Sequence, residues 1–322
     1  MCGRRTGQLG RLVLAAGIVG LFGSHAIAEE VNLPADSVQI GMVNTLFRDV
    51  PKSMLAIMDA PFKTLMRTQT GLDGEIVRSD TADKLAQQLL EERVQLGVLF
   101  GFQYAQVRLD HPELRPLMIA VNQSRHLKAN LIIRADDAST KDFADLKGKT
   151  LALPHRSREH CHFFLERRCE KCGQCPDKHF AKITTPADAE EAMDDVVDGV
   201  VQGAVIDSLA LECYKRRKPG RFERLKISQE SEIFPATVIV YKPGAVGEST
   251  LQRFRNGMVN ANKSFLGSRL LGFWKLTGFE PTPDDYDKTL DDILKAYPPP
   301  KKVTGTKKSQ NPETKGQTAA QK

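Results

Sequence analysis

The sequence predicts an α/β fold made of two hinged lobes, with a ligand cleft between them. Apolar strands alternate with amphipathic helices in the first third of the chain, a pattern typical of a parallel sheet covered by helices. The alternation starts again near residue 150, and two helices near the end of the chain follow a final strand. We expect these two helices to pack on the first lobe, so that the chain crosses between the lobes twice and forms a hinge.

The first unit reads strand, helix, strand, helix, strand. Alternating apolar residues at 38–43 predict a buried strand. Apolar residues at helical spacing predict a helix over 51–71, which ends at a glycine. A strand, a helix and a nearly continuous apolar strand follow at 74–79, 81–94 and 95–101.

A second unit of similar size begins with a strand at 150–154 and a helix over 157–168. A strand, a helix and a strand follow at 180–184, 186–199 and 203–207. Two successive α/β units predict two lobes with the ligand at the carboxyl ends of the strands. We assign the first lobe to residues 31–122 and 236–297, and the second lobe to residues 123–235 with a Cys-rich loop at 169–176.

The two ends of the chain differ from its middle. Residues 1–28 combine three arginines, a short apolar run and a small-residue cleavage pattern. These features predict a signal peptide for export to the periplasm, because the apolar run is too short for a membrane span. Residues 298–322 carry six lysines and no apolar periodicity, which predicts a disordered tail.

The positive charge of the chain belongs to these ends. The formal net charge is +6, of which residues 1–28 carry +3 and residues 298–322 carry +5, so that residues 29–297 carry −2. Nothing in the globular part therefore indicates a nucleic-acid partner. The sequence has no nucleotide-binding glycine loop, GxSxG or HExxH motif, so we expect a monomeric binding protein, not an enzyme, without a cofactor.

One stretch of 23 residues, 154–176, holds four cysteines and three histidines. The cysteines allow three interpretations: a metal site, a disulfide-stapled loop, and unpaired thiols. Among the disulfides, Cys172 with Cys175 or Cys169 with Cys175 is the easiest geometrically. An exported protein favours disulfides. The candidates for a metal site or a disulfide are Cys161, Cys169, Cys172 and Cys175. A bond between Cys161 and Cys169 requires the helix to end before Cys169, because eight residues of straight helix separate them by about 12 Å.

Four segments resemble the phosphate/phosphite/phosphonate-binding class of substrate-binding proteins of ABC transporters. They are "IGMVNTLFRDVPKSMLAIMDAPFKTLMRTQTG", "LAQQLLEERVQLGVLFGFQYA", "DLKGKTLALPHRSREHCHFFLE", and "VDGVVQGAVIDSLALECY" with "FPATVIVYKPG". Together they span about residues 38–297. The resemblance implies the two-lobed periplasmic-binding-protein fold (type II), a small phosphate, phosphite or phosphonate ligand in the cleft, and a membrane permease as partner.

The resemblance also implies where the ligand binds. The ligand-binding segments of the family correspond to the ends of three strands and to the turn before the helix at 157–168. The matching residues are Asn44, Thr45, Leu46, Gly101, Phe102, Tyr104, Ser157 and Asp207. In the turn, the family usually has successive Ser or Thr residues and then Gly, whereas this chain has "HRSREHC". Because His and Arg side chains are larger than those of Ser and Thr, an anion larger than phosphonate, or of different charge, is an alternative ligand.

The physical chemistry of the turn supports an anion site independently. A helix N-terminus presents unpaired backbone N–H groups and partial positive charge to an oxyanion. Arginines beside it add charge-assisted hydrogen bonds. We therefore add His155, Arg156, Arg158 and His160 to the predicted site.

Two alternative functions remain open. A metal- or redox-handling protein would use the Cys/His cluster on the same fold. A ligand-sensing subunit would present the closed form to a sensor kinase instead of a permease.

Overall fold

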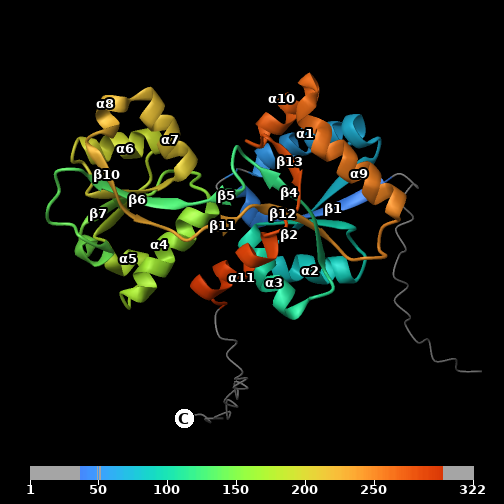
Figure 1. The fold of residues 1–322 in the computed structure, drawn as a ribbon, viewed down its shortest axis with the longest axis horizontal. Helices are drawn as coiled ribbons and strands as arrows, with labels where there is room; N and C mark the ends of the chain where they lie inside the picture. The colour runs from blue at the N-terminus through green and yellow to red at the C-terminus, as the bar shows by residue number, and fades with distance from the viewer. Residues whose placement is uncertain (1–36, 49, 51, 300–322) are drawn as a thin grey trace, which may run out of the picture. The chain divides into compact units, whose positions relative to one another are not determined.

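The computed structural model describes residues 37–48, 50 and 52–299 (Figure 1). The predicted signal peptide at 1–28 and the tail from residue 300 onward lie outside the described residues. Within the described part of the chain, no helix is both long and apolar enough to cross a membrane.

The first sheet has six strands in the order β13-β4-β12-β3-β1-β2. Its strands are β1 (Ser37–Val43), β2 (Asp73–Ser79), β3 (Leu96–Leu99), β4 (Arg115–Val121), β12 (Thr237–Tyr241) and β13 (Gly278–Pro281). β1 runs parallel to β2 and β3, with Ile40 opposite both Ile76 and Leu96. β12 runs antiparallel to β3 and β4. The predicted parallel pairing is thus found for the first three strands, and the returning strand makes the sheet mixed.

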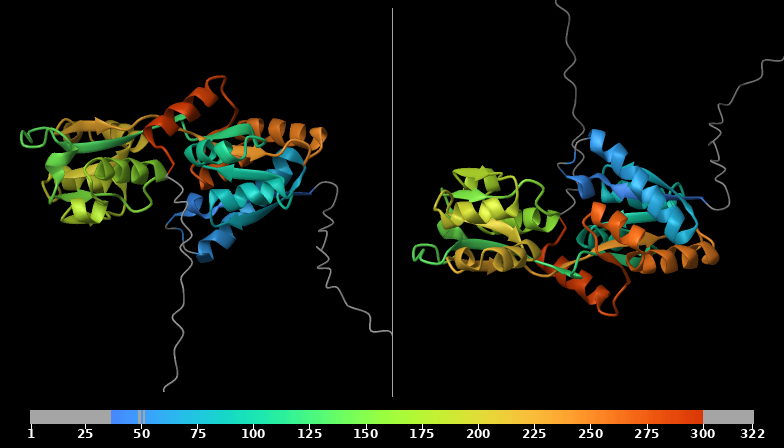
Figure 2. Two further views of the ribbon diagram at one scale, coloured as in Figure 1. Left: turned by 90° about the horizontal axis from the view of Figure 1, so that it is seen from below. Right: turned by 90° about the horizontal axis from the view of Figure 1, so that it is seen from above.

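Helices cover both faces of this sheet (Figures 1 and 2). One face packs on α2 (Ala82–Leu90), α3 (Gly101–Asp110) and α11 (Tyr286–Ala296), and the other on α1 (Lys52–Thr70), α9 (Glu248–Asn260) and α10 (Phe265–Phe273). The packing on α2 is close, because a Cβ at Gly41 of β1 would lie 2.2 Å from Leu85 Cδ1. The sequence predicted two helices after β12 that pack on the first lobe. The structure has three, α9, α10 and α11, with β13 between the last two, and all three pack on the first sheet.

The second sheet has five strands in the order β10-β6-β9-β7-β8. They are β6 (Ala129–Arg134), β7 (Thr150–Ala152), β8 (Lys182–Thr184), β9 (Gly203–Asp207) and β10 (Leu225–Glu230). β7 is parallel to β8 and β9, whereas β6 is antiparallel to β9 and β10. Its helices are α4 (Glu159–Lys171), α5 (Pro176–His179), α6 (Ala189–Val197), α7 (Ser208–Arg217) and α8 (Pro219–Phe222), with the 3-10 turn η2 (Phe143–Leu146).

Two short segments join the sheets. β5 (His126–Leu127) lies between β4 and β6 in the chain, and β11 (Phe234–Pro235) lies between β10 and β12. They pair with each other antiparallel, with Phe234 opposite Leu127. The two chain crossings therefore run side by side, and the predicted α/β fold is confirmed.

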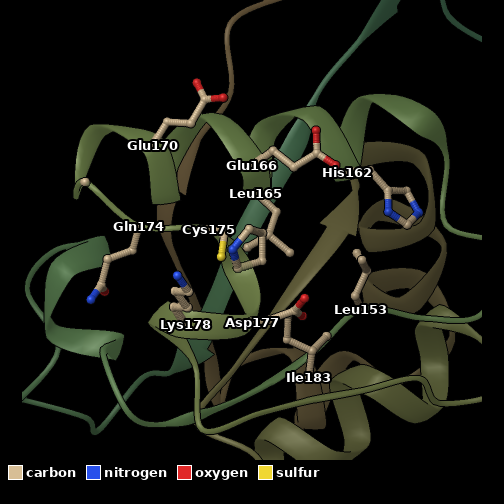
Figure 3. A pocket seen from close by; sticks show the side chains of 12 residues that line it. Leu153, His162, Leu165, Glu166, Glu170, Gln174, Cys175, Asp177, Lys178 and Ile183 are labelled. Carbon is tan, nitrogen blue, oxygen red and sulfur yellow. The ribbon is translucent and has the colours of Figure 1, made fainter. Parts of the chain in front are cut away.

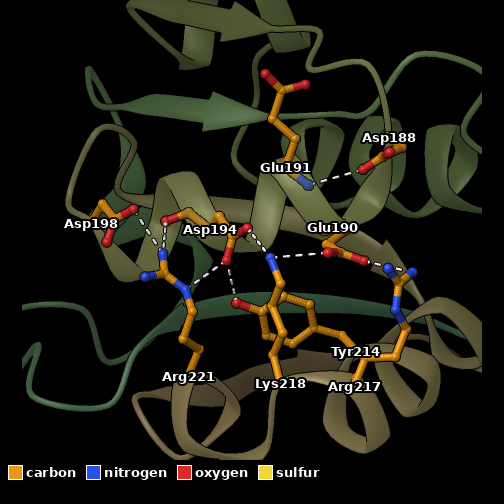
Figure 4. A network of polar contacts seen from close by, with 9 residues as sticks. All are labelled: Asp188, Glu190, Glu191, Asp194, Asp198, Tyr214, Arg217, Lys218 and Arg221. Atoms are coloured by element: carbon orange, nitrogen blue, oxygen red, sulfur yellow. Dashed lines mark hydrogen bonds and ion pairs between the residues drawn. The ribbon is translucent and has the colours of Figure 1, made fainter.

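An ion-pair network joins α6 to α7 and α8 on one face of the second sheet (Figure 4). The Asp194 carboxylate accepts hydrogen bonds from Tyr214 Oη at 2.7 Å, Lys218 Nζ at 2.5 Å and Arg221 Nε at 2.6 Å. Burial raises the pKa of Asp194, but these three donors outweigh burial and hold the pKa below its ordinary value.

Candidate functional site

The loops at the carboxyl ends of four parallel strands supply the predicted ligand residues. β1 leads into the 3-10 turn η1 (Asn44–Phe47), and β3 leads into α3. β7 leads into the turn before α4, and β9 ends at Asp207. Ligands of open α/β sheets bind at such strand ends. The candidate site is therefore expected at these strand ends.

The turn before α4 differs from the prediction. Arg158 is the N-cap and Glu159 the first helical residue, so the helix begins two residues after the predicted start at Ser157. The Ser157 backbone N–H and hydroxyl both donate to the Pro154 carbonyl, at 3.0 and 2.7 Å. The local turn thus uses the hydroxyl that the sequence assigned to the ligand.

The two residues before Ser157 are exposed. Arg156 has φ of 58°, in the left-handed region that non-glycine residues seldom adopt. His155 donates its backbone N–H to the Pro186 carbonyl at 2.7 Å.

An ion pair that the sequence did not predict joins the two halves of the site. Arg48, the residue after η1, places Nε 2.6 Å from Glu159 Oε2 and a second nitrogen 2.5 Å from Oε1. The Glu159 side chain is only 4% exposed, against 41% for Arg48. Two parallel N–H···O bonds to a buried carboxylate form the strongest geometry available to such a pair.

The sequence contains a signal for each of the two residues, although none for their contact. An acidic residue in the first turn of a helix is favoured by the helix dipole, and Glu159 follows the predicted helix start by two residues. Arg48 follows the predicted ligand loop at Asn44–Leu46 by two residues. Their contact across 111 residues of chain has no local signature.

Asp207 caps α7 and also lies beside His160 and Arg158. It caps α7 by accepting from the backbone N–H groups of Leu209 and Ala210 at 3.0 and 3.3 Å. Its other oxygen lies 3.0 Å from His160 Nε2 and 3.8 Å from Arg158 Nε. Burial raises the pKa of Asp207, but His160 and Arg158 outweigh it, so the pKa lies below the ordinary value.

The turn and helix α4 therefore bring together Arg158, His160 and Asp207. His160 is buried, at 4% exposure, and its ring also packs on Phe234 of the crossing strand β11 at 5.7 Å between centroids. Glu159, the partner of Arg48, lies between Arg158 and His160 in the chain. The group thus places the Arg158 guanidinium and the His160 ring beside a single carboxylate, that of Asp207.

An aromatic cluster adjoins the site. Phe102 of α3 contacts Phe163 of α4, with ring centroids 4.1 Å apart, and also contacts Phe100 and Phe234. Phe102 is buried. Its place between α3 and α4 makes it a contact between elements of the two sheets.

Tyr104 lies in the core of the first lobe. It is 3% exposed, and its hydroxyl donates to the Leu114 carbonyl at 3.1 Å. Burial, followed by the charge of Asp287, raises its pKa to about 12. The structure gives this hydroxyl a structural partner and does not bring it to Asp207 or His160.

The remaining predicted residues belong to the first-sheet loops. Asn44 is exposed and donates to Asp80, at 3.0 Å. Thr45 accepts from Gln103 Nε2 at 3.0 Å, and Leu46 packs against the core. Gly101 has room for no side chain, because a Cβ there would lie 2.4 Å from the Ala236 carbonyl oxygen.

The predicted disulfide is wrong for the described structure, in which Cys161, Cys169, Cys172, Cys175 and Cys213 are all free. α4 continues through Cys169 to Lys171, so Cys161 and Cys169 stay about 12 Å apart along one helix. Burial, followed by the nearby Cys172 and Cys175, raises the pKa of Cys169 to about 12. Among the described residues, no group of three Cys, His, Asp or Glu side chains is arranged to hold a metal ion.

A cavity of about 840 Å³ opens between α4 and α5 (Figure 3). Leu153, Leu165 and Ile183 form apolar wall, and Glu166 and Asp177 contribute carboxylates. None of the predicted ligand residues line this cavity. We place the candidate site at the strand ends, because loops from both sheets meet there, whereas this cavity is formed by the second lobe alone.

The chain has two α/β lobes, each built on one sheet, and two crossings between them. Residues 51–286 match the family described as "ABC transporter, phosphonate, periplasmic substrate-binding protein". The chain therefore belongs to the phosphonate-binding family of periplasmic substrate-binding proteins. A comparison with curated proteins found no match.

Solved structures agree on the fold. PhnD1 from Prochlorococcus marinus, in complex with methylphosphonate, has a TM-score of 0.53 and 13% identity over 81% of this chain and 98% of that one. A binding protein component of an ABC phosphonate transporter from Pseudomonas aeruginosa (PA3383) has a TM-score of 0.50 and 16% identity over 81% and 85%. XAC2383 from Xanthomonas citri bound to ATP has a TM-score of 0.54 and 15% identity over 81% and 96%. The predicted two-lobed periplasmic-binding-protein fold is confirmed.

Proposed function

We propose that this chain is the exported solute-binding component of an ABC transporter. In this proposal, it captures a phosphate- or phosphonate-like oxyanion in the cleft between its lobes and delivers it to a membrane permease. In this proposal the mature protein is located in the periplasm, after cleavage of the predicted signal peptide. The observation that carries the proposal is that, in a member of the phosphonate-binding family, Arg48 of the first lobe pairs with Glu159, which lies between Arg158 and His160 at the start of α4.

The residues divide the work of binding between the lobes. Arg48 and the η1 loop belong to the first sheet, whereas Arg158, His160 and the first turn of α4 belong to the second. An oxyanion held by both sets stabilises the closed arrangement, because the two sets of contacts exist together only when the lobes are closed. The permease then receives the closed form.

Calorimetry on the mature chain tests the proposal with phosphate, phosphite, methylphosphonate and sulfate as probes. We expect binding of at least one phosphorus oxyanion, and Arg158→Gln should weaken it about tenfold or more, because it removes a charge-assisted contact. Arg67→Gln is the matched control, since Arg67 pairs with Asp73 on the exposed side of the first lobe. Failure of the folded protein to bind any of the four anions would contradict the proposal.

A further inference from the structure

Helix α10 exposes a stripe of apolar side chains to solvent. Phe265 is 79% exposed, Phe273 49% and Leu266 46%. Leu266 and Phe273 are seven residues apart, with the half-buried Leu270 between them, so these three side chains share one face of the helix. Isolated apolar side chains are common on protein surfaces, but a contiguous group of them indicates a surface that contacts another body.

The opposite face of α10 is fixed to the first lobe. Gly267 and Leu271 are its buried residues, and a Cβ at Gly267 would lie 2.0 Å from the Ala261 carbonyl oxygen. At the end of the helix, the Trp274 ring meets the Phe62 ring of α1 edge to face, with centroids 5.8 Å apart. α10 thus lies at the outer edge of the layer that it forms with α1 and α9, and its apolar stripe stays exposed (Figure 1).

The chain around this stripe is basic. Residues 249–279 contain five Lys or Arg residues and no Asp or Glu, although residues 29–297 as a whole carry −2. Lys263, Arg269 and Lys275 are exposed, and in the described part of the chain none of the three forms an ion pair. The Arg269 guanidinium lies over the Phe265 ring, 5.5 Å from its centroid. Apolar and cationic side chains therefore share one surface.

We propose that α10 is a membrane-contact surface, which binds the exported chain to a lipid bilayer with anionic headgroups. Interfacial helices bury Phe, Leu and Trp side chains at the headgroup boundary, while Lys and Arg contact the lipid phosphates. α10 presents both sets together. A protein partner is less suited to this surface, because the centres of protein interfaces are depleted of lysine and other charges. The contact does not use the strand-end site and goes beyond the proposed function.

Trp274 provides a direct test of the contact. It is the only tryptophan of the chain and lies at the end of α10, so its fluorescence reports on this surface. The mature chain is titrated with phosphatidylcholine vesicles and with vesicles that contain about one quarter phosphatidylglycerol. We expect a shift of the emission to shorter wavelength and energy transfer to a dansyl-labelled lipid. Binding to the anionic vesicles should be at least about fivefold tighter and should weaken as salt is raised.

Two double variants separate the apolar part of the contact from the charged part. Phe265→Ser with Phe273→Ser should weaken binding to both kinds of vesicle about tenfold or more. Arg269→Gln with Lys275→Gln should weaken binding to the anionic vesicles alone, by about fivefold or more. Leu109→Ser is the matched control, because Leu109 is 57% exposed on α3, which covers the other face of the first sheet. The control should leave vesicle binding unchanged.

The Lys-rich segment at 298–322 is present in every variant, so any vesicle binding that it causes is the same in all of them. Equal binding by the wild type and the Phe265→Ser, Phe273→Ser variant would therefore overturn the inference. Failure of the wild type to bind anionic vesicles would also overturn it. If the wild type then dimerises in sedimentation experiments and this variant does not, the apolar stripe binds a second copy of the chain instead.

Calorimetry with methylphosphonate keeps this result apart from the proposed function. None of the predicted ligand residues lies on α10, so the Phe265→Ser, Phe273→Ser variant should bind the anion as the wild type does. A loss of anion binding in this variant would mean that the substitutions act on the fold and not on a membrane contact, and would overturn the inference.

Discussion

Two ion-pair sites of the second lobe show how the same chemistry serves different purposes. The Asp194 network joins α6, α7 and α8 within 20 to 27 residues of chain. The Glu159 pair instead joins α4 to the loop after β1, 111 residues away. The first site belongs to one lobe whatever the other lobe does. The second exists only while elements of the two sheets are in contact, so its strength bears on how the two lobes are held together.

The largest effect on stability should come from the Asp194 network. Asp194→Ala leaves Tyr214, Lys218 and Arg221 without their shared acceptor. The site is partly exposed, so we expect a loss of about 2 kcal/mol in the free energy of unfolding. Urea unfolding measures this loss.

The exposed pair of Arg134 with Asp136 provides the control. Asp136→Ala should leave the free energy of unfolding nearly unchanged, because the pair is exposed and exposed pairs contribute little. If the two variants lose equal stability, the Asp194 network contributes no more to stability than an exposed ion pair does.

A smaller effect should appear as a dependence of stability on pH. The pKa values of Asp194 and Asp207 both lie below their ordinary value, so the folded chain binds fewer protons than the unfolded one. The stability they contribute is complete above the unfolded pKa of about 3.9 and is lost as pH falls through the lower folded values. Urea midpoints measured between about pH 3 and 6 should therefore fall toward acid.

Asn variants assign the acid dependence to its source. Asp194→Asn should reduce the dependence of stability on acid pH by the share that the Asp194 network contributes. Asp207→Asn should reduce it by the share that Asp207 contributes. An acid slope that stays the same in both variants would mean that other carboxylates are responsible for it.

The sequence predicted much of the fold because its signals are local. Alternating apolar residues placed β1, and helical spacing together with a terminal glycine placed α1 within one or two residues. The first turn of α4 could not be predicted in the same way. Pro154 captures Ser157 through two hydrogen bonds, which moves the helix start to Glu159 and makes that residue, not Ser157, face the opposite lobe.

Long-range partners and competing side chains account for the other differences. The resemblance assigned Tyr104 to the ligand, but its hydroxyl donates a hydrogen bond to the carbonyl of Leu114 inside the core. The Cys-rich stretch suggested a stapled loop, yet α4 continues through Cys169. In both cases the residue type indicated a role, and the surrounding structure, which spacing does not encode, decided against it.

The smallest effect on stability should come from the Arg48–Glu159 pair, although it is the better buried of the two sites. A double-mutant cycle of Arg48→Ala and Glu159→Gln isolates the pair from the cost of each single change. We expect a coupling of about 1 kcal/mol in unfolding, because Arg48 is 41% exposed and the desolvation of Glu159 offsets much of the attraction. Chemical denaturation of the four proteins without ligand measures it. A coupling near zero would mean that the pair does not hold the two sheets together in the ligand-free chain. A coupling larger than the stability lost in Asp194→Ala would mean that the Arg48–Glu159 pair, and not the Asp194 network, contributes more to stability.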